Sequence, residues 1–124
     1  MNVLVVDDDA DLLRLVAASV KRVQSGITVH TQSDGLKAIE TMRSLNFDFV
    51  VCDVMMPALD GARLCETLAA DQQLRAVPVV LLTTIESDAL ASVLRLPNVR
   101  GYIQKPISVP ALRDRLSELF AASH

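Results

Sequence analysis

The sequence predicts a single α/β domain in which a parallel five-stranded sheet carries helices on both faces. Short, β-branched apolar runs alternate five times with segments whose apolar residues recur at helical spacing. Such alternation requires right-handed strand-helix-strand crossovers, and these place helices on the two faces of a doubly wound parallel sheet. The 124 residues are enough for one hydrophobic core, so we expect residues 1–124 to form one domain.

The first two strands and helices are predicted within the first 45 residues. Residues 3–6 form an apolar run too short for a helix and are predicted to be a strand. Residues 9–24 show helical spacing, and Gly26 follows as a stop signal. Residues 27–31 alternate between apolar and polar side chains, as a second strand would, and the segment 33–45 then begins with turn residues and continues as a helix.

Residues 47–52 are predicted to form the central strand, which is followed directly by Asp53. Pro57 has no N–H group and disfavours a helical conformation at Met56, so the chain must leave the sheet here. Asp53 is therefore expected at the carboxyl edge of the sheet, where open α/β sheets bind ligands. Taken alone, an acid in this position is equally well explained as a helix cap or turn residue.

Three helices and two strands are predicted in the remaining chain. Residues 62–70 have helical spacing, and residues 78–82 form a buried strand. A helix is expected from about residue 87 to residue 95, where a following proline closes it. Residues 99–104 form the last strand, and Ser108 can cap a final helix.

Composition and charge exclude several classes of protein. The net charge of −3 without clustered Lys or Arg predicts no nucleic-acid binding. No segment approaches the apolar length of a membrane span, and acids interrupt the N-terminal apolar run, so we expect a cytoplasmic protein without a membrane partner. Cys52 and Cys65 lack metal-site or redox-motif spacing and are expected in the core of a protein from a reducing compartment, and His30 and His124 predict no zinc site.

Polar residues follow four of the predicted strands and should meet at one edge of the sheet. They are Asp7, Asp8, Asp53, Thr83, Thr84 and Lys105. Carboxylates held this close repel one another unless a hard divalent cation neutralises them, which predicts Mg²⁺ as the cofactor. An aspartate beside Mg²⁺ can attack phosphorus, while a hydroxyl and an ammonium stabilise the oxygens of the transferring group.

Five motifs in chain order resemble the receiver domain of two-component response regulators, of the chemotaxis-regulator type. They are Val5-Val6-Asp7-Asp8, Asp53-Val54-Met55-Met56-Pro57, Asp60-Gly61, Leu82-Thr83 and Gly101-Tyr102-Ile103-Gln104-Lys105-Pro106. The resemblance covers essentially the whole chain. It implies a flavodoxin-like (βα)5 fold with strand order 2-1-3-4-5 and a phosphoacceptor signalling domain rather than an enzyme.

By this resemblance, Asp53 accepts a phosphoryl group from a histidine kinase or a phosphotransfer protein. Asp8, Asp53 and the backbone carbonyl of Met55 would bind Mg²⁺, and Asp7 would act mainly through a metal-bound water. Lys105 would contact the phosphoryl group directly.

The resemblance also implies a switch. Thr83 would move toward the phosphoryl group and Tyr102 would move inward behind it, changing the surface formed by residues 87–95, residues 99–104 and the last helix. That surface would control an output domain or a downstream protein, as a monomer or a phosphorylation-dependent dimer. The segment 96–101 departs from the relatives that form a symmetric winged-helix-type dimer, which argues against that dimer here.

Residues beside Asp53 predict a long-lived phosphoryl group. Neither Met55 nor Ile85 can orient a water molecule for hydrolysis, and Thr84 stands where the family usually has Ala or Gly. The bulk of Thr84 should obstruct the approach of water, so slow self-dephosphorylation is expected.

Other interpretations remain open from the sequence. Taken singly, Thr83 could simply end a strand and Tyr102 could be a surface aromatic residue. A Mg²⁺-dependent phosphohydrolase with an aspartyl-phosphate intermediate is a second candidate, although such phosphatases of the haloacid-dehalogenase type place an acid two residues after the nucleophile and this chain has Met55 there. A third is a receiver-like docking module that is never phosphorylated, against which the intact acids and lysine argue.

Overall fold

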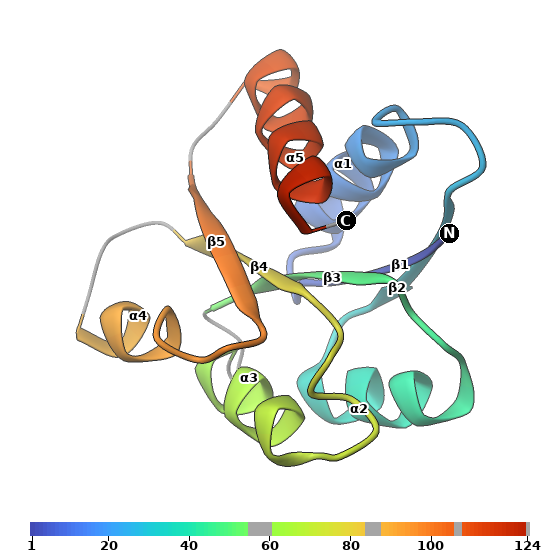
Figure 1. The fold of residues 1–124 in the computed structure, drawn as a ribbon. Helices are drawn as coiled ribbons and strands as arrows, with labels where there is room; N and C mark the ends of the chain where they lie inside the picture. Colours follow the sequence, from blue (N-terminus) through green and yellow to red (C-terminus); the bar gives the residue numbers. More distant parts are fainter. Residues whose placement is uncertain (55–60, 84–87, 106–107, 124) are drawn as a thin grey trace.

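The structure, a computed structural model, describes residues 1–54, 61–83, 88–105 and 108–123. Strands and helices alternate along these residues (Figure 1). The strands are β1 (Asn2–Val6), β2 (Thr28–Gln32), β3 (Phe49–Asp53), β4 (Val79–Thr83) and β5 (Val99–Gln104). The helices are α1 (Ala10–Lys21), α2 (Gly35–Ser44), α3 (Gly61–Ala70), α4 (Asp88–Val93) and α5 (Val109–Ser123).

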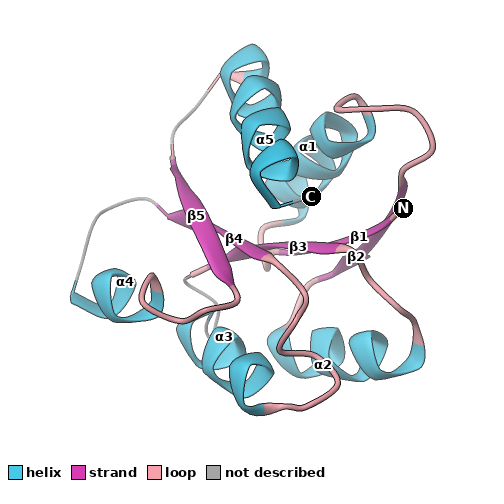
Figure 2. Ribbon diagram, in the orientation of Figure 1, coloured by secondary structure: helices cyan, strands magenta, loops and turns pink. Residues whose placement is uncertain are grey.

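The strands form one five-stranded sheet in the order β2-β1-β3-β4-β5, and every neighbouring pair is parallel. Helices α1 and α5 cover one face of this sheet, and α2, α3 and α4 cover the other (Figure 2). The predicted doubly wound architecture and strand order are therefore confirmed. No helix of the described residues has the length and apolar character needed to cross a membrane.

Each face of the sheet has its own hydrophobic core because alternate side chains of a strand point to opposite faces. In β1, Leu4 and Val6 pack with the residues of α2, α3 and α4. Val3 and Val5 pack instead with α1 and α5. Both faces of the central strands are thus buried, which explains why these strands are continuous apolar runs in the sequence.

Side chains cap three of the helices, among them the last one, for which the sequence predicts Ser108 as the cap. The Asp9 carboxylate accepts hydrogen bonds from the backbone N–H groups of Asp11 and Leu12 at the start of α1. Asp34 caps α2 and Ser108 caps α5 in the same way, each accepting a hydrogen bond from a backbone N–H three residues later. These caps satisfy amides that lack a partner within the helix and set where each helix begins.

Some boundaries differ from the prediction. Helix α1 ends at Lys21 rather than Gln24, because the N–H of Arg22 bonds back only three residues, to the carbonyl of Ser19. Strand β3 begins at Phe49 rather than at residue 47, and Phe47 packs edge-on against His30 with ring centroids 5.2 Å apart. That contact gives His30 a structural role.

Helix α4 is shorter than predicted and ends at Val93. The N–H groups of Arg95 and Leu96 donate to carbonyl oxygens three residues earlier, so the last turn tightens before the chain enters β5. The register between β4 and β5 then shifts after the pair Val79 and Val99, leaving Arg100 as an extra residue. This shift fixes which residues of β5 reach the carboxyl edge.

Candidate functional site

Two neighbouring strands bring three carboxylates together. Val6 of β1 lies beside Cys52 of β3, so the residues that follow them, Asp7 and Asp53, emerge side by side at the carboxyl edge. Asp7, Asp8 and Asp53 each have an oxygen atom that lies within 4.8 Å of those of the other two. Asp7 and Asp53 are buried, whereas Asp8 is exposed.

Lys105 joins this group from the end of β5. Its Nζ lies 3.2 Å from Oδ2 of Asp53 and 3.5 Å from Oδ2 of Asp7. The backbone N–H of Lys105 donates to the carbonyl of Thr83 at 2.6 Å, which ties the lysine to the end of β4. The predicted meeting of the acids with Lys105 is therefore present in the structure.

The environment of Asp7 favours a cation beside it. Burial raises the pKa of Asp7 from 3.8 to about 6, and the negative charge of Asp53 adds to the rise, while the N–H of Asp9 and the ammonium of Lys105 oppose it. Oδ1 of Asp7 accepts a hydrogen bond from the N–H of Asp9 at 3.0 Å. Oδ2 is buried and has no hydrogen-bond partner among the described residues, and Nζ of Lys105 lies 3.5 Å from it as an ion pair. Such a buried carboxylate oxygen beside two further carboxylates fits a hard divalent cation.

Two further predicted residues, Thr83 and Tyr102, lie on β4 and β5. Thr83 is buried at the end of β4. The residue before it, Leu82, is the register partner of Asp53, so Thr83 lies next to the end of the strand that carries Asp53. Tyr102 is half-buried in β5, beside Leu81, and packs against the core under α2, α3 and α4. Met55, Thr84 and Ile85 lie outside the described residues, so their predicted roles stay predictions.

Two features of the site were not evident from the sequence. The N–H of Asp9 donates to Oδ1 of Asp7, although in the sequence Asp9 only begins a predicted helix. Gly61 was named only as part of the motif Asp60-Gly61, yet its N–H donates to the carbonyl of Val54 at 2.8 Å, directly after Asp53. The position of Asp9 two residues after Asp7 was a usable signal for the first contact, whereas the second requires knowing where α3 packs.

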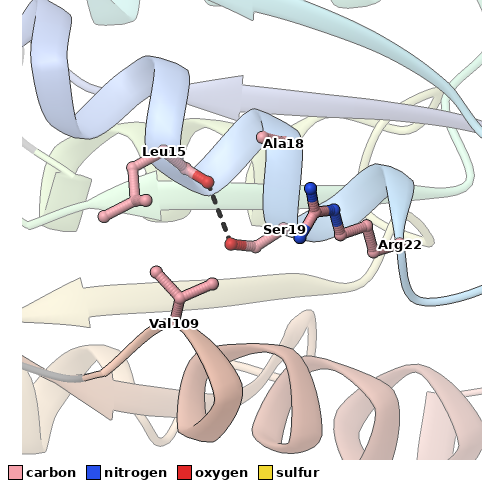
Figure 3. A pocket seen from close by; sticks show the side chains of 5 residues that line it. All are labelled: Leu15, Ala18, Ser19, Arg22 and Val109. Carbon is pink, nitrogen blue, oxygen red and sulfur yellow. Dashed lines mark hydrogen bonds between the residues drawn. The ribbon is translucent and has the colours of Figure 1, made fainter.

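A separate hollow of about 240 Å³ opens between α1 and the start of α5 (Figure 3). It is lined by Leu15, Ala18, Ser19, Arg22 and Val109. The Ser19 hydroxyl within it donates to the carbonyl of Leu15 at 2.9 Å. Because no member of the acidic cluster lines it, this hollow is not part of the site.

Comparisons with known proteins agree with the geometry. The sequence profile of the response regulator receiver domain matches residues 3–117. Chemotaxis protein CheY-3 of Vibrio cholerae is 31% identical over 120 residues, which cover 97% of this chain and 92% of that protein. Heme response regulator HssR of Staphylococcus epidermidis is 35% identical over 118 residues, 94% of this chain and 50% of that protein.

Solved structures give the same result. The chemotaxis response regulator CheY4 of Vibrio cholerae superposes with a TM-score of 0.83 at 25% identity, covering 95% of this chain and 97% of that one. The receiver domain of the Francisella response regulator 1452 superposes with a TM-score of 0.80 at 29% identity, over 99% and 98% of the two chains. The flavodoxin-like fold is thereby confirmed. The matched profile includes the strands that carry the acidic cluster. The chain therefore belongs to the response regulator receiver domains, the phosphoacceptor signalling domains of two-component systems.

Proposed function

We propose that Asp53 is the phosphoacceptor of this receiver domain and that Mg²⁺ binds beside it. Asp7, Asp8 and Asp53, with the backbone carbonyl of Met55, would hold the metal ion. The observation that carries the proposal is the cluster of three carboxylates within 4.8 Å of one another, with Nζ of Lys105 only 3.2 Å from Oδ2 of Asp53. Receiver domains bind Mg²⁺ through such an acidic pocket, and the donor set here suits it.

The transfer is a nucleophilic displacement at phosphorus. A carboxylate oxygen of Asp53 forms the new bond while the bond from phosphorus to the donor's imidazole nitrogen breaks, and the electron pair stays on that nitrogen. Mg²⁺, when bound, supplies positive charge that offsets the charge on the phosphoryl oxygens. Lys105 contributes a second positive charge, and its N–H bond to the carbonyl of Thr83 holds the lysine backbone in place.

The ion pairs of Lys105 support a change of partner during the reaction. Before transfer, the ammonium lies between Asp53 and Asp7. After transfer, the oxygens of the phosphoryl group on Asp53 carry more negative charge than the free Asp53 carboxylate carried before. The ammonium then contacts the phosphoryl group, and this contact stabilises the phosphorylated state.

The proposed switch runs from Thr83 to Tyr102. Thr83 is buried at the end of β4, and Tyr102 is half-buried in the neighbouring β5, so a hydroxyl and a ring lie on adjacent strands. A small movement of such groups biases a packed surface between two arrangements. Thr83→Ala should still accept phosphate but lose the phosphorylation-dependent NMR shifts in α4 and β5, and identical shifts in both proteins would place the switch elsewhere.

The output surface would be formed by α4, β5 and α5, which lie together at the β5 edge of the sheet (Figure 1). We propose that this surface contacts an output domain or a downstream protein, that the chain acts in the cytoplasm, and that it is a monomer or a phosphorylation-dependent dimer. Residues 1–124 would act as one receiver unit, without direct contact with nucleic acid. Sedimentation with and without phosphodonor distinguishes the two assembly states.

A long phosphoryl lifetime is proposed from Met55, Thr84 and Ile85, none of which orients an attacking water molecule well. The combined change Met55→Asn with Ile85→Glu should shorten the lifetime, and Thr84→Ala should speed both loading and loss. Decay of the phosphoprotein in excess Mg²⁺ after donor removal measures this. Equal or slower decay in the double variant would show that these positions do not set the lifetime.

The proposed phosphorylation is tested by incubating the protein with acetyl phosphate or phosphoramidate and Mg²⁺, followed by intact mass. We expect one phosphoryl group on the parent protein and none on Asp53→Asn. Asp71→Asn is a matched control, because Asp71 is an aspartate that pairs with Arg43 away from the site, at 2.9 Å. Continuous release of inorganic phosphate without accumulation of phosphoprotein would favour the phosphohydrolase instead.

A further inference from the structure

Gly61 is the first residue of α3, and it is buried against the strand that carries Asp53. Its N–H donates to the carbonyl of Val54 at 2.8 Å. This hydrogen bond joins the helix directly to the residue that follows Asp53. The start of α3 therefore contacts the backbone that carries the proposed phosphoacceptor.

The contact leaves no room for a side chain at position 61. A Cβ atom there would lie 2.2 Å from the carbonyl oxygen of Asp53, 2.9 Å from its carbonyl carbon and 2.8 Å from Cα of Val54. Non-bonded carbon atoms prefer separations of about 3.5–4.0 Å, and a carbon and an oxygen only slightly shorter ones, so each of these distances is a collision. All three atoms belong to the backbone, and they can move only if the peptide that links Asp53 to Val54 moves.

Conformational freedom does not explain this glycine. Among the described residues, the glycines with positive φ are Gly26 and Gly101, and Gly61 is not one of them. Any residue could adopt the backbone conformation of Gly61, so only the close approach to Asp53 requires the absence of a side chain. Gly26 is the opposite case, with φ of 82° and no atom within 4 Å of the position that a Cβ atom would take.

We propose that Gly61 is a positioning residue for phosphoryl transfer. By allowing α3 to pack directly on the peptide after Asp53, it fixes the Asp53 carboxylate relative to Asp7, Asp8 and Lys105. This inference rests on the proposed role of Asp53 as phosphoacceptor. A side chain at position 61 displaces that peptide, and a misplacement of roughly 1 Å at a reacting group costs on the order of a hundredfold in rate.

The test compares Gly61→Ala with Gly26→Ala, which makes the same chemical change at a glycine with open space around it. Phosphorylation by acetyl phosphate is followed at increasing Mg²⁺, and rates are corrected for the folded fraction from circular dichroism. Mg²⁺ affinity is measured separately by calorimetry. We expect Gly61→Ala to lose on the order of tenfold to a hundredfold in rate at saturating Mg²⁺, while Gly26→Ala stays close to the parent rate.

The phosphorylation rate at saturating Mg²⁺ distinguishes a positioning role of Gly61 from a general loss of stability. A purely structural role would lower the melting temperature of both variants and leave the corrected rate at saturating Mg²⁺ unchanged, and that result would overturn the proposal. If Gly61→Ala does not fold, hydrogen exchange of the Gly61 amide in the parent protein takes its place. Protection that increases with Mg²⁺ is expected, and exchange as fast as at an exposed amide would overturn the inference.

Failure of the proposed function gives a different pattern. A parent protein that takes up no phosphoryl group would remove the role of Asp53 but not the close contact at Gly61. In that case the calorimetric comparison still decides: weaker Mg²⁺ binding by Gly61→Ala than by Gly26→Ala supports positioning of the acidic cluster, and equal binding contradicts it.

Discussion

The amino and carboxyl ends of the sheet both carry aspartates, but in opposite environments. At the amino end, Asp48 is exposed and accepts a hydrogen bond from the backbone N–H of Asn2 at 2.8 Å. At the carboxyl end, Asp7 is buried, and its Oδ2 has no hydrogen-bond partner among the described residues and only the ion pair with Lys105 at 3.5 Å. The first arrangement stabilises the fold, whereas the second disfavours the ionised acid and suits a bound cation.

The largest expected effect is a rise in the free energy of unfolding when Asp7, at the carboxyl end of the sheet, loses its charge. In the metal-free protein the pKa of Asp7 rises from 3.8 to about 6, so the native state binds more protons than the unfolded state between these values. The free energy of unfolding therefore falls as pH rises from about 4 to about 6, and the full shift corresponds to roughly 3 kcal/mol. Asp7→Asn should remove this decline and stabilise the metal-free protein at neutral pH.

Urea unfolding in the presence of a chelator, at a series of pH values, measures that difference. The parent and Asp7→Asn should converge in stability near pH 4 and separate as pH rises. An equally steep decline in both proteins would show that another group causes it, and the contrast between the two ends of the sheet would then not depend on Asp7.

A smaller effect is expected when Mg²⁺ is added. A ligand that binds only the native state adds RT ln(1 + [L]/Kd) to stability, or roughly 1.4 kcal/mol at about tenfold excess over Kd. Asp8→Ala should lose most of this gain, whereas Asp48→Ala at the other end should keep it. Melting temperatures with and without Mg²⁺ measure the gain, and no change in the parent protein would rule out the proposed metal site.

The smallest effect is expected at the amino end. Asp48→Ala removes the hydrogen bond to the N–H of Asn2, which should cost about 1 kcal/mol because the group is exposed and water can replace it. Chemical denaturation measures the loss. Phosphorylation of this variant should match the parent, and a slower reaction would show that the two ends of the sheet are coupled.

The sequence was sufficient to predict the order of strands and helices and to identify the strand ends that carry the acids. Buried parallel strands are continuous apolar runs, and caps such as Asp9 and Asp34 mark where helices begin. The strand order came from the family resemblance rather than from these patterns. The meeting of Asp53 with Lys105 followed from parallel strands sharing one edge.

Features that depend on how distant segments of the chain pack together could not be predicted from the sequence. Strand β3 begins only at Phe49, directly after Asp48, whose side chain accepts the backbone N–H of Asn2, and Phe47 packs against His30 from another strand. The closeness of Gly61 to the carbonyl of Asp53 depends on how α3 sits on the sheet, which no local pattern encodes. The rise in the pKa of Asp7 likewise depends on its burial beneath neighbouring elements.

Chemical trapping gives the most direct test that Asp53 is the phosphorylated residue. Borohydride reduces an aspartyl phosphate to homoserine, and peptide mass spectrometry locates the converted residue. After incubation with acetyl phosphate and Mg²⁺, we predict homoserine at position 53 in the parent protein and none in Asp53→Asn. Homoserine at Asp7 or Asp8, or an unmodified Asp53 in folded protein that binds Mg²⁺, would contradict the assignment.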